Sequence, residues 1–285
     1  SLSATQWRED ISYLRSELPK RNSHLSVDPR LGRRFDQEAA ALAEGITDST
    51  SPGEIIVGIS RLLAGLGEGH TSLNAAPHVV YPVSAHWFAD GFYVVASDVD
   101  RREIVGAEVL GIRRPNGVFV DAETIEIILR EVISVDHPNG YRLAAGQRLM
   151  NPYLMRGLGL ADESGLNLVV APDDEAAESS TIKLSPRPYG ETQFVGVAQL
   201  RERTPLSASR PEPMWWTRAG ESDEIVYVSY QSSRLDAFGF FRSVLKEIRD
   251  DRTTRVIIDI RANSGGASIA GTRFAARLGR IRRLK

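Results

Sequence analysis

The sequence predicts an α/β fold with three regions: a helical bundle over residues 1–78, a β-rich region over 79–200, and the first part of a parallel α/β core over 201–285. Three observations support this prediction. Apolar residues repeat at helical spacing in the first region, short apolar runs separated by turn residues fill the second, and strands alternate with helices in the third.

Composition and charge exclude several classes of protein. A chain of 285 residues can bury a core without disulfides or metal ions. The 35 Lys and Arg against 37 Asp and Glu give a formal net charge of −2, so the broad basic field that nucleic acids or anionic membranes require is missing. Cysteine is absent, which excludes thiol catalysis. We therefore expect no nucleic-acid partner, and the short apolar runs predict no membrane span.

Three helices are predicted in the first region. Two are indicated by apolar residues at i, i+4, i+7 and i+11: Trp7, Ile11, Leu14 and Leu18, then Phe35, Ala39, Leu42 and Ile46. The third has a capping box, with Ser51 as N-cap, Pro52 at the first helical position and Glu54 three residues after the cap. Gly67 can end this helix in the left-handed conformation.

The second region is predicted to contain two hairpins. Asp90-Gly91 separates strands over 79–83 and 92–96, and Pro115-Asn116-Gly117 separates strands over 107–113 and 118–120. A helix over 122–133 follows the second hairpin. Further along, an acidic loop over 171–180 precedes a strand over 181–184.

The third region begins with a predicted surface crossing over 201–221, which contains Trp215 and Trp216. A strand over 224–230, a helix, a buried strand over 255–260 and a second helix near Ser268 then follow. This order predicts parallel strands joined by right-handed crossovers, with ligands bound beyond the carboxyl ends of the strands.

Two segments could carry chemistry. Gly65-Leu66-Gly67-Glu68-Gly69-His70-Thr71 is a glycine-rich exit from a helix. A dinucleotide loop is excluded because the helix comes before the glycines instead of after them. His70 is instead placed to act as a general base, or alternatively to hydrogen-bond a turn.

The second segment runs from Ile257 to Gly266. Its glycine pair, Gly265 and Gly266, lies between a strand and a helix, where backbone N–H groups could form an oxyanion hole. Alternatively, the glycines serve only the tight turn, and Asp259 pairs with Arg261 to hold the loop.

Taken together, the motifs resemble those of the tail-specific or C-terminal processing serine peptidases, the family that contains the tricorn core protease. The likeness runs in order through ISRLLAGLGEGHTSL, YPVSAHWFADGFYVV, IVGAEVLGI, VYVSY and VIIDIRANSGG. It implies a PDZ-like module in the β-rich region and a crotonase-like core. It also implies that His70 is the general base and that Gly265 and Gly266 supply the oxyanion hole.

The family has two versions of the catalytic base, and this chain departs from the family at two points. Other members use a Ser–Lys pair, but Lys20, Lys183, Lys246 and Lys285 lack suitable surroundings, so the histidine version is preferred. Glu68 stands where the family usually has Asp. The resemblance implies that the nucleophilic serine and the orienting acid lie beyond Lys285. Ser264 and Ser268 are alternative nucleophiles, but they are disfavoured because they belong to the oxyanion turn itself. We therefore expect a C-terminal fragment or a second subunit to complete the site.

The expected partner is a peptide or protein substrate, with no cofactor. His70, His78 and His86 recur every eight residues, but no metal site is predicted because no carboxylate-bearing helix accompanies them. The alternative function is a non-catalytic protein that binds peptides or hydrophobic ligands on the same fold. The compartment stays open, with an extracytoplasmic or secreted location favoured over the cytoplasm.

Overall fold

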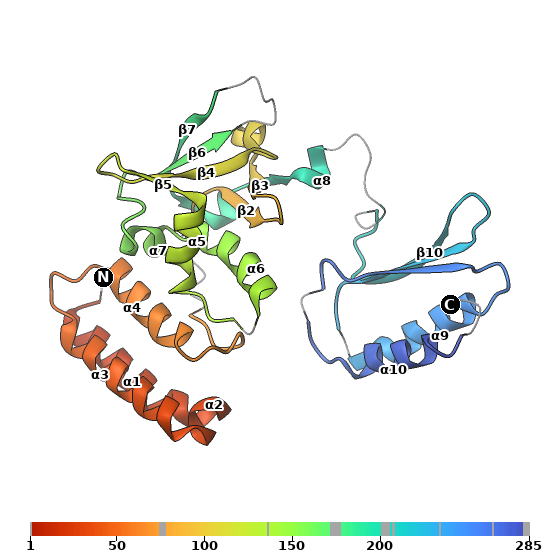
Figure 1. The fold of residues 1–285 in the computed structure, drawn as a ribbon, viewed down its shortest axis with the longest axis horizontal. Helices are drawn as coiled ribbons and strands as arrows, with labels where there is room; N and C mark the ends of the chain where they lie inside the picture. The colour runs from red at the N-terminus through yellow and green to blue at the C-terminus, as the bar shows by residue number, and fades with distance from the viewer. Residues whose placement is uncertain are drawn as a thin grey trace. The chain divides into compact units, whose positions relative to one another are not determined.

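The computed structural model describes residues 2–73, 78–135, 137–171, 178–200, 206, 209–233, 235–263 and 265–281. By its internal contacts the chain divides into two compact units, Ser1–Leu200 and Arg201–Lys285. Both contain helices and strands (Figure 1). They are called unit 1 and unit 2.

Unit 1 opens with helices, three of which the sequence predicts; the short helix over 23–27 was not predicted. They are α1 (Ala4–Arg21), α2 (Ser23–Val27), α3 (Pro29–Gly45) and α4 (Pro52–Ala64). Both predicted apolar stripes face one shared core, in which Phe35 and Ala39 are fully buried. The capping box of α4 is confirmed, since Ser51 and Glu54 each accept a hydrogen bond from the other's backbone N–H. Gly67 has a φ of +64°, which confirms the left-handed residue after this helix.

A seven-stranded antiparallel sheet follows these helices. Its strands are β2 (Val83–Trp87), β3 (Phe92–Asp98), β4 (Glu108–Arg113), β5 (Phe119–Asp121), β6 (Leu166–Ala171), β7 (Ser180–Leu184) and β9 (Phe194–Gly196). The main path is β2-β3-β4-β6-β7, with β5 beside β4 and β9 beside β3. The short elements around it are β1 (Val79–Val80), β8 (Arg187–Pro188), η1 (Val99–Ile104), η2 (Tyr189–Glu191) and α8 (Val197–Leu200).

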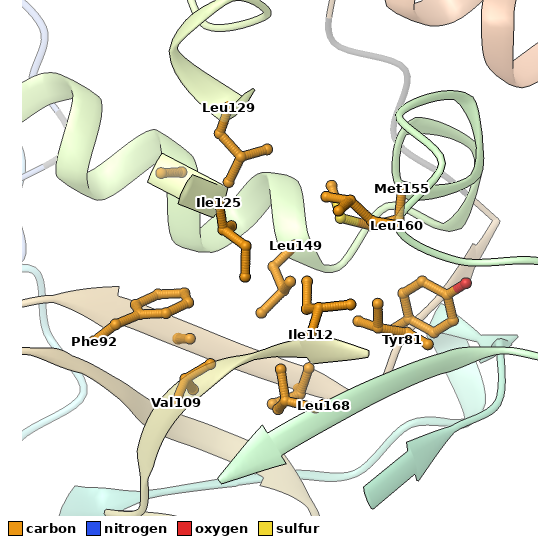
Figure 2. Close-up of a cluster of buried hydrophobic side chains, with 14 of the residues drawn as sticks. Tyr81, Phe92, Val109, Ile112, Ile125, Leu129, Leu149, Met155, Leu160 and Leu168 are labelled. Carbon is orange, nitrogen blue, oxygen red and sulfur yellow. The ribbon is translucent and has the colours of Figure 1, made fainter. Parts of the chain in front are cut away.

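Helices pack against this sheet across the largest apolar core of the chain. They are α5 (Ala122–Arg130), α6 (Pro138–Leu149) and α7 (Pro152–Gly157). Figure 2 shows Ile125 and Leu149 from the helices lying over Ile112 and Leu168 from the strands. A close contact between Gly53 and Gly157 joins α4 to α7, because a Cβ atom on Gly53 would lie 2.7 Å from the Tyr153 carbonyl oxygen. The helical bundle is thereby attached to the sheet.

The predicted hairpins of unit 1 are present, with one change of boundary. Trp87 pairs with Phe92 around the Asp90-Gly91 turn, and β4 pairs with β5 around Gly117. The first strand was predicted over 79–83, but the strand paired with β3 is Val83–Trp87. Pro82 explains the shift, because it has no N–H to donate to the ladder. The predicted loop over 171–180 lies mostly outside the described residues.

Unit 2 is a three-stranded sheet of order β10-β11-β12. Its elements are β10 (Met214–Ala219), β11 (Ile225–Tyr230), η4 (Leu235–Ala237), α9 (Phe238–Ile248), β12 (Arg255–Asp259) and α10 (Ile269–Leu278). The predicted parallel pairing of β11 with β12 is confirmed, and β10 is antiparallel to β11. Both α9 and α10 cover the same face of the sheet (Figure 1) and share a core with Val226 and Val228.

Two sequence-based predictions about unit 2 are wrong. Trp215 and Trp216 were predicted within a surface crossing, but they lie in β10 and pair with β11, and Trp215 is buried. The strand over 255–260 was predicted to be buried, but Ile257 is 47% and Ile258 is 38% exposed. The physical reason is position: β12 is an edge strand of this sheet, so its apolar side chains lack neighbours on one side.

Candidate functional site

The His70 turn, residues 65–73, presents an imidazole on a pinned backbone. The His70 side chain is 93% exposed. Its backbone N–H donates to Glu68 Oε1 at 2.8 Å, and its Nδ1 lies 3.5 Å from the same carboxylate oxygen. The imidazole is therefore open to a ligand on one side and faces a carboxylate on the other.

Glu68 holds this turn together. The Thr71 hydroxyl donates to Glu68 Oε2, and Asn22, between α1 and α2, donates from Nδ2 to Thr71 Oγ1 at 2.9 Å. From the other side, Ser134 Oγ donates to the Glu68 carbonyl oxygen at 2.6 Å. The hydrogen bond from Thr71, together with the one from the His70 amide, lowers the pKa of Glu68, so this side chain is a carboxylate at neutral pH.

A cavity of about 340 Å³ adjoins the His70 turn. Gly69 and His70 line it from the turn, Ser134 and His137 from the segment between α5 and α6, and Arg148 from α6. The His137 ring caps α6, with Nδ1 accepting from the Gly140 N–H at 3.0 Å. Sequence reasoning missed Ser134, His137 and Arg148. Only the α6 cap left a local signal, a polar residue just before Pro138, and nothing local indicates that α6 lies beside His70.

The second candidate feature is the glycine turn, residues 261–267, which follows β12. It is held against the chain that leaves β11: the Ser233 N–H donates to the Gly265 carbonyl at 3.0 Å, and the Ala267 N–H donates to the Ser233 carbonyl at 2.7 Å. Asn263 adds a bond from Nδ2 to the Tyr230 carbonyl at 2.8 Å. The parallel pairing thus continues beyond the two strands to the glycines.

The two glycine amides differ in their hydrogen bonding. The Gly265 N–H donates to Asn263 Oδ1 at 2.8 Å, whereas the Gly266 N–H has no partner within the described residues. The Asn two residues before Gly265 is a sequence signal for this bond, because Asn side chains commonly accept from the backbone two residues on. Gly266 has a φ of +120°, and a Cβ atom there would overlap the Ser233 carbonyl oxygen. Only glycine fits at this position.

Asp259 anchors the start of the glycine turn. Its Oδ2 accepts from Tyr227 Oη at 2.5 Å and from Arg261 Nη2 at 2.6 Å, and its Oδ1 accepts from the Arg261 N–H at 3.1 Å. The Arg261 guanidinium, opposed in part by burial, holds the pKa of Asp259 far below its usual range. Burial and the Asp259 carboxylate raise the pKa of Tyr227 to about 12. The pairing of Asp259 with Arg261, one of the two interpretations of this motif, is therefore present.

The predicted site residues lie in different units. His70 belongs to unit 1, and Gly265 and Gly266 belong to unit 2. Ser264 lies outside the described residues. Ser268 directly precedes α10, with no capping hydrogen bond from its side chain. Convergence of the imidazole with the glycine amides stays a prediction.

The described residues lack both a metal-binding cluster and a membrane-spanning helix. Those residues contain no group of three or more His, Asp or Glu side chains that could hold a metal ion. Nor is any described helix both long and apolar enough to span a bilayer.

No protein-family model and no curated protein matches this chain by sequence. Among solved structures, mature CPAF matches with a TM-score of 0.53 and 18% identity, over 94% of this chain and 57% of that chain. Mature CPAF complexed with lactacystin matches with a TM-score of 0.56 and 15% identity, over 95% of this chain and 58% of that chain. The photosystem II D1 C-terminal processing protease has a TM-score of 0.28 and 12% identity, over 89% of this chain and 64% of that chain.

The two CPAF structures show the fold of this chain, a mixture of helices with several antiparallel sheets. The chain spans a little under three fifths of the length of the CPAF chains, since it covers 57% and 58% of them.

Proposed function

We propose that this chain carries the general base and part of the oxyanion hole of a serine-type peptide hydrolase of the tail-specific kind. One observation carries the proposal. A chain with the fold of mature CPAF, which is tail-specific protease-like, also contains Gly69-His70-Thr71 and the Asp259-x-Arg261-x-Asn263-x-Gly265-Gly266 signature in the family's order.

His70 would act as the base through Nε2. A carboxylate facing Nδ1, as Glu68 does at 3.5 Å, favours the tautomer with the proton on Nδ1 and leaves Nε2 free to accept one. The serine hydroxyl would transfer its proton to Nε2 as its oxygen attacks the peptide carbonyl carbon. His70 would then return the proton to the leaving amine as the C–N bond breaks.

The Gly266 N–H would stabilise the negative oxygen of the tetrahedral intermediate. It is the amide of the glycine pair that is not already bonded within the described residues. One well-placed donor of this kind contributes about 3 to 4 kcal/mol to transition-state stabilisation. The hydrogen bonds that Asn263 and Ser233 form with the turn would keep it rigid, so that no reorganisation is needed during the reaction.

The nucleophile would arrive on a further strand beside β12. The exposed Ile257 and Ile258 side chains of β12 are suited to a neighbouring apolar strand. As an edge strand, β12 also has backbone groups available for pairing. We propose that a C-terminal fragment or a second subunit supplies this strand together with the catalytic serine.

The test is hydrolysis of an unstructured peptide by the assembly that contains the nucleophile. His70→Ala is expected to lower kcat about 10²- to 10⁴-fold, the usual contribution of a general base. The matched control is His78→Ala, which removes an exposed histidine outside the cavity. Unchanged hydrolysis by His70→Ala would remove this histidine from the mechanism.

Convergence of the two turns can be tested separately, because the chain contains no cysteine. Ser72→Cys places a thiol on the His70 turn, and Ser268→Cys places one after the glycine turn. The proposal expects a disulfide or a short bifunctional reagent to join them within one chain. Failure of every short cross-linker, with each single cysteine fully labelled, would separate the turns and exclude a shared site.

One observation favours the alternative function, binding of a hydrophobic ligand. A second cavity of about 530 Å³ is lined by Trp7, Ile11, Leu14 and Leu63 from α1 and α4, and by Leu73. An apolar fluorescent probe that binds the wild type, but not Leu14→Arg, would support that function. If the wild type does not bind the probe, binding of a hydrophobic ligand in this cavity is excluded.

A further inference from the structure

Arg148 is a half-buried cation that has no anionic partner among the described residues. It lies on α6 and lines the cavity beside His70. Its Nη1 donates to the Leu73 carbonyl oxygen at 3.2 Å, and within the described residues it forms no ion pair. Burial lowers the pKa of Arg148, but a guanidinium in a protein remains protonated. Within the described part of the chain, most of its five N–H donors are therefore unused.

Three other arginines of unit 1 differ in this respect. Arg61, Arg130 and Arg156 each pair with a glutamate at distances of 2.8, 2.5 and 2.8 Å. Arg61 and Arg130 are more than half exposed, with side-chain exposures of 54% and 57%. Water already stabilises their charges, so they need a counter-ion less than Arg148 does. A charge removed from water without a counter-ion costs free energy, which an anionic ligand would recover.

The cavity around Arg148 is chemically suited to an anion. None of the described residues that line it is acidic. His137 adds a donor, because Nδ1 accepts from the Gly140 N–H and the ring proton is consequently on Nε2 when the ring is neutral. The volume of about 340 Å³ lies at the lower end of the range for small-ligand sites, roughly 300 to 1,000 Å³. It is large enough for one side chain or one chain end.

We propose that this cavity binds a carboxylate of the substrate next to His70, with Arg148 as the residue that determines specificity. The inference rests on the proposed function, since a peptide substrate offers carboxylates of two kinds: an Asp or Glu side chain, and the C-terminal carboxylate. The planar guanidinium fork matches either one with two parallel hydrogen bonds. Substrates that carry a carboxylate near the scissile bond would be preferred.

The experiment compares four fluorescent peptides for binding to the full chain by anisotropy. They share one unstructured sequence, with Asp or Asn at the centre and a free acid or an amide at the C-terminus. The wild type is expected to lose about tenfold or more in affinity when the recognised carboxylate becomes an amide, as for a hydrogen bond to a charged group. The position that shows the loss identifies the source of the carboxylate.

Variants then assign the preference to Arg148. Arg148→Gln is expected to bind all four peptides equally weakly, whereas Arg142→Gln, an exposed position on the same helix, keeps the wild-type preference. If Arg148→Gln does not fold, Arg148→Lys replaces it. This variant is expected to retain a smaller preference, because an ammonium group cannot form the paired bonds. Equal binding of the four peptides to the wild type, or an undiminished preference in the Arg148 variant, overturns the inference.

The two proposals fail independently. Binding is measured without any hydrolysis, so loss of the carboxylate preference with His70-dependent cleavage intact refutes only the role of Arg148. Conversely, a preference that depends on Arg148 in a protein whose cleavage does not require His70 refutes only the role of His70 as general base and leaves the carboxylate-binding cavity.

Discussion

The His70 turn and the glycine turn are both fixed by polar side chains, but they leave different groups free. In the His70 turn, Glu68, Thr71 and Ser134 hold the backbone, and the imidazole is exposed. In the glycine turn, Asn263 and backbone bonds to Ser233 hold the chain, and the free group within the described residues is the Gly266 N–H. One turn presents a side chain, and the other presents an amide.

Their supports also differ in extent. The His70 turn is bonded to residues from the end of α1 and the end of α5. Among the described residues, the glycine turn is braced on the β11 side only, because β12 forms the edge of their sheet. A turn braced on two sides tolerates the loss of one contact better than a turn braced on one side. We therefore expect substitutions in the glycine turn to have the larger effects on stability.

The largest effect is expected for Gly266→Ala. The new Cβ atom would overlap the Ser233 carbonyl oxygen at a φ of +120°, so both strain and the lost pairing contribute, together about 3 kcal/mol. Gly265→Ala is the matched control, because its φ is +94° but nothing lies within 4 Å of the added atom. It should cost about 1 to 2 kcal/mol. Hydrogen exchange of peptides from β11 and β12 measures both; equal costs would mean that Ser233 does not brace the turn.

Asp259→Asn should cost about 2 kcal/mol at neutral pH, since charge-assisted bonds to Tyr227 and Arg261 are lost. The pKa of Asp259 is lowered in the folded state, so its contribution is complete above the unfolded-state value of about 3.9 and is lost as the pH falls through the folded-state value. The difference between wild type and variant, measured by urea unfolding, should therefore shrink below about pH 4. A constant difference down to pH 2 would exclude the carboxylate as its source.

Glu68→Gln should have a smaller effect, about 1 kcal/mol, because other bonds still hold the His70 turn. The measurement is hydrogen exchange of the His70 amide, which should become about fivefold faster. The pKa of Glu68 is lowered, so in the wild type this protection is present above about pH 4.3 and is lost as the pH falls through the folded-state value. The variant should show no such acid loss. Thr71→Val is the control, because it removes the hydrogen bond from the Thr71 hydroxyl to Glu68 and leaves the carboxylate.

Local signals predicted most of the fold. The capping box at Ser51 and Glu54, the turn at Asp90-Gly91 and the order of strands and helices after residue 224 all depend on neighbours in sequence. The register of β2 was missed because a single Pro82 displaced a strand that the apolar pattern alone would begin earlier.

The sites were predicted less completely, for a physical reason. His70 and the glycine pair stand out as residue types, but the cavity depends on α6 lying beside the His70 turn, a contact between residues far apart in sequence. The burial of β12 was overpredicted for the same reason. An apolar run such as Val256 to Ile258 indicates a strand that can be buried, whereas its actual neighbours decide whether it is.

The smallest effect on stability is expected at the free edge of the sheet, on β12. It tests whether the glycine turn is supported from one side. Ile257→Thr should change the stability of this chain by no more than about 0.5 kcal/mol, because the side chain is 47% exposed. Val228→Thr, a substitution of the same kind on the neighbouring strand β11, should cost about 2 kcal/mol, because it places a hydroxyl in a fully buried site. Urea unfolding compares the two. In the assembly with the nucleophile, a strand paired with β12 would bury Ile257. The loss of unfolding free energy caused by Ile257→Thr would then rise toward the loss caused by Val228→Thr. If the cost of Ile257→Thr is the same in both forms, no strand joins this edge, and the proposed route for the serine is wrong.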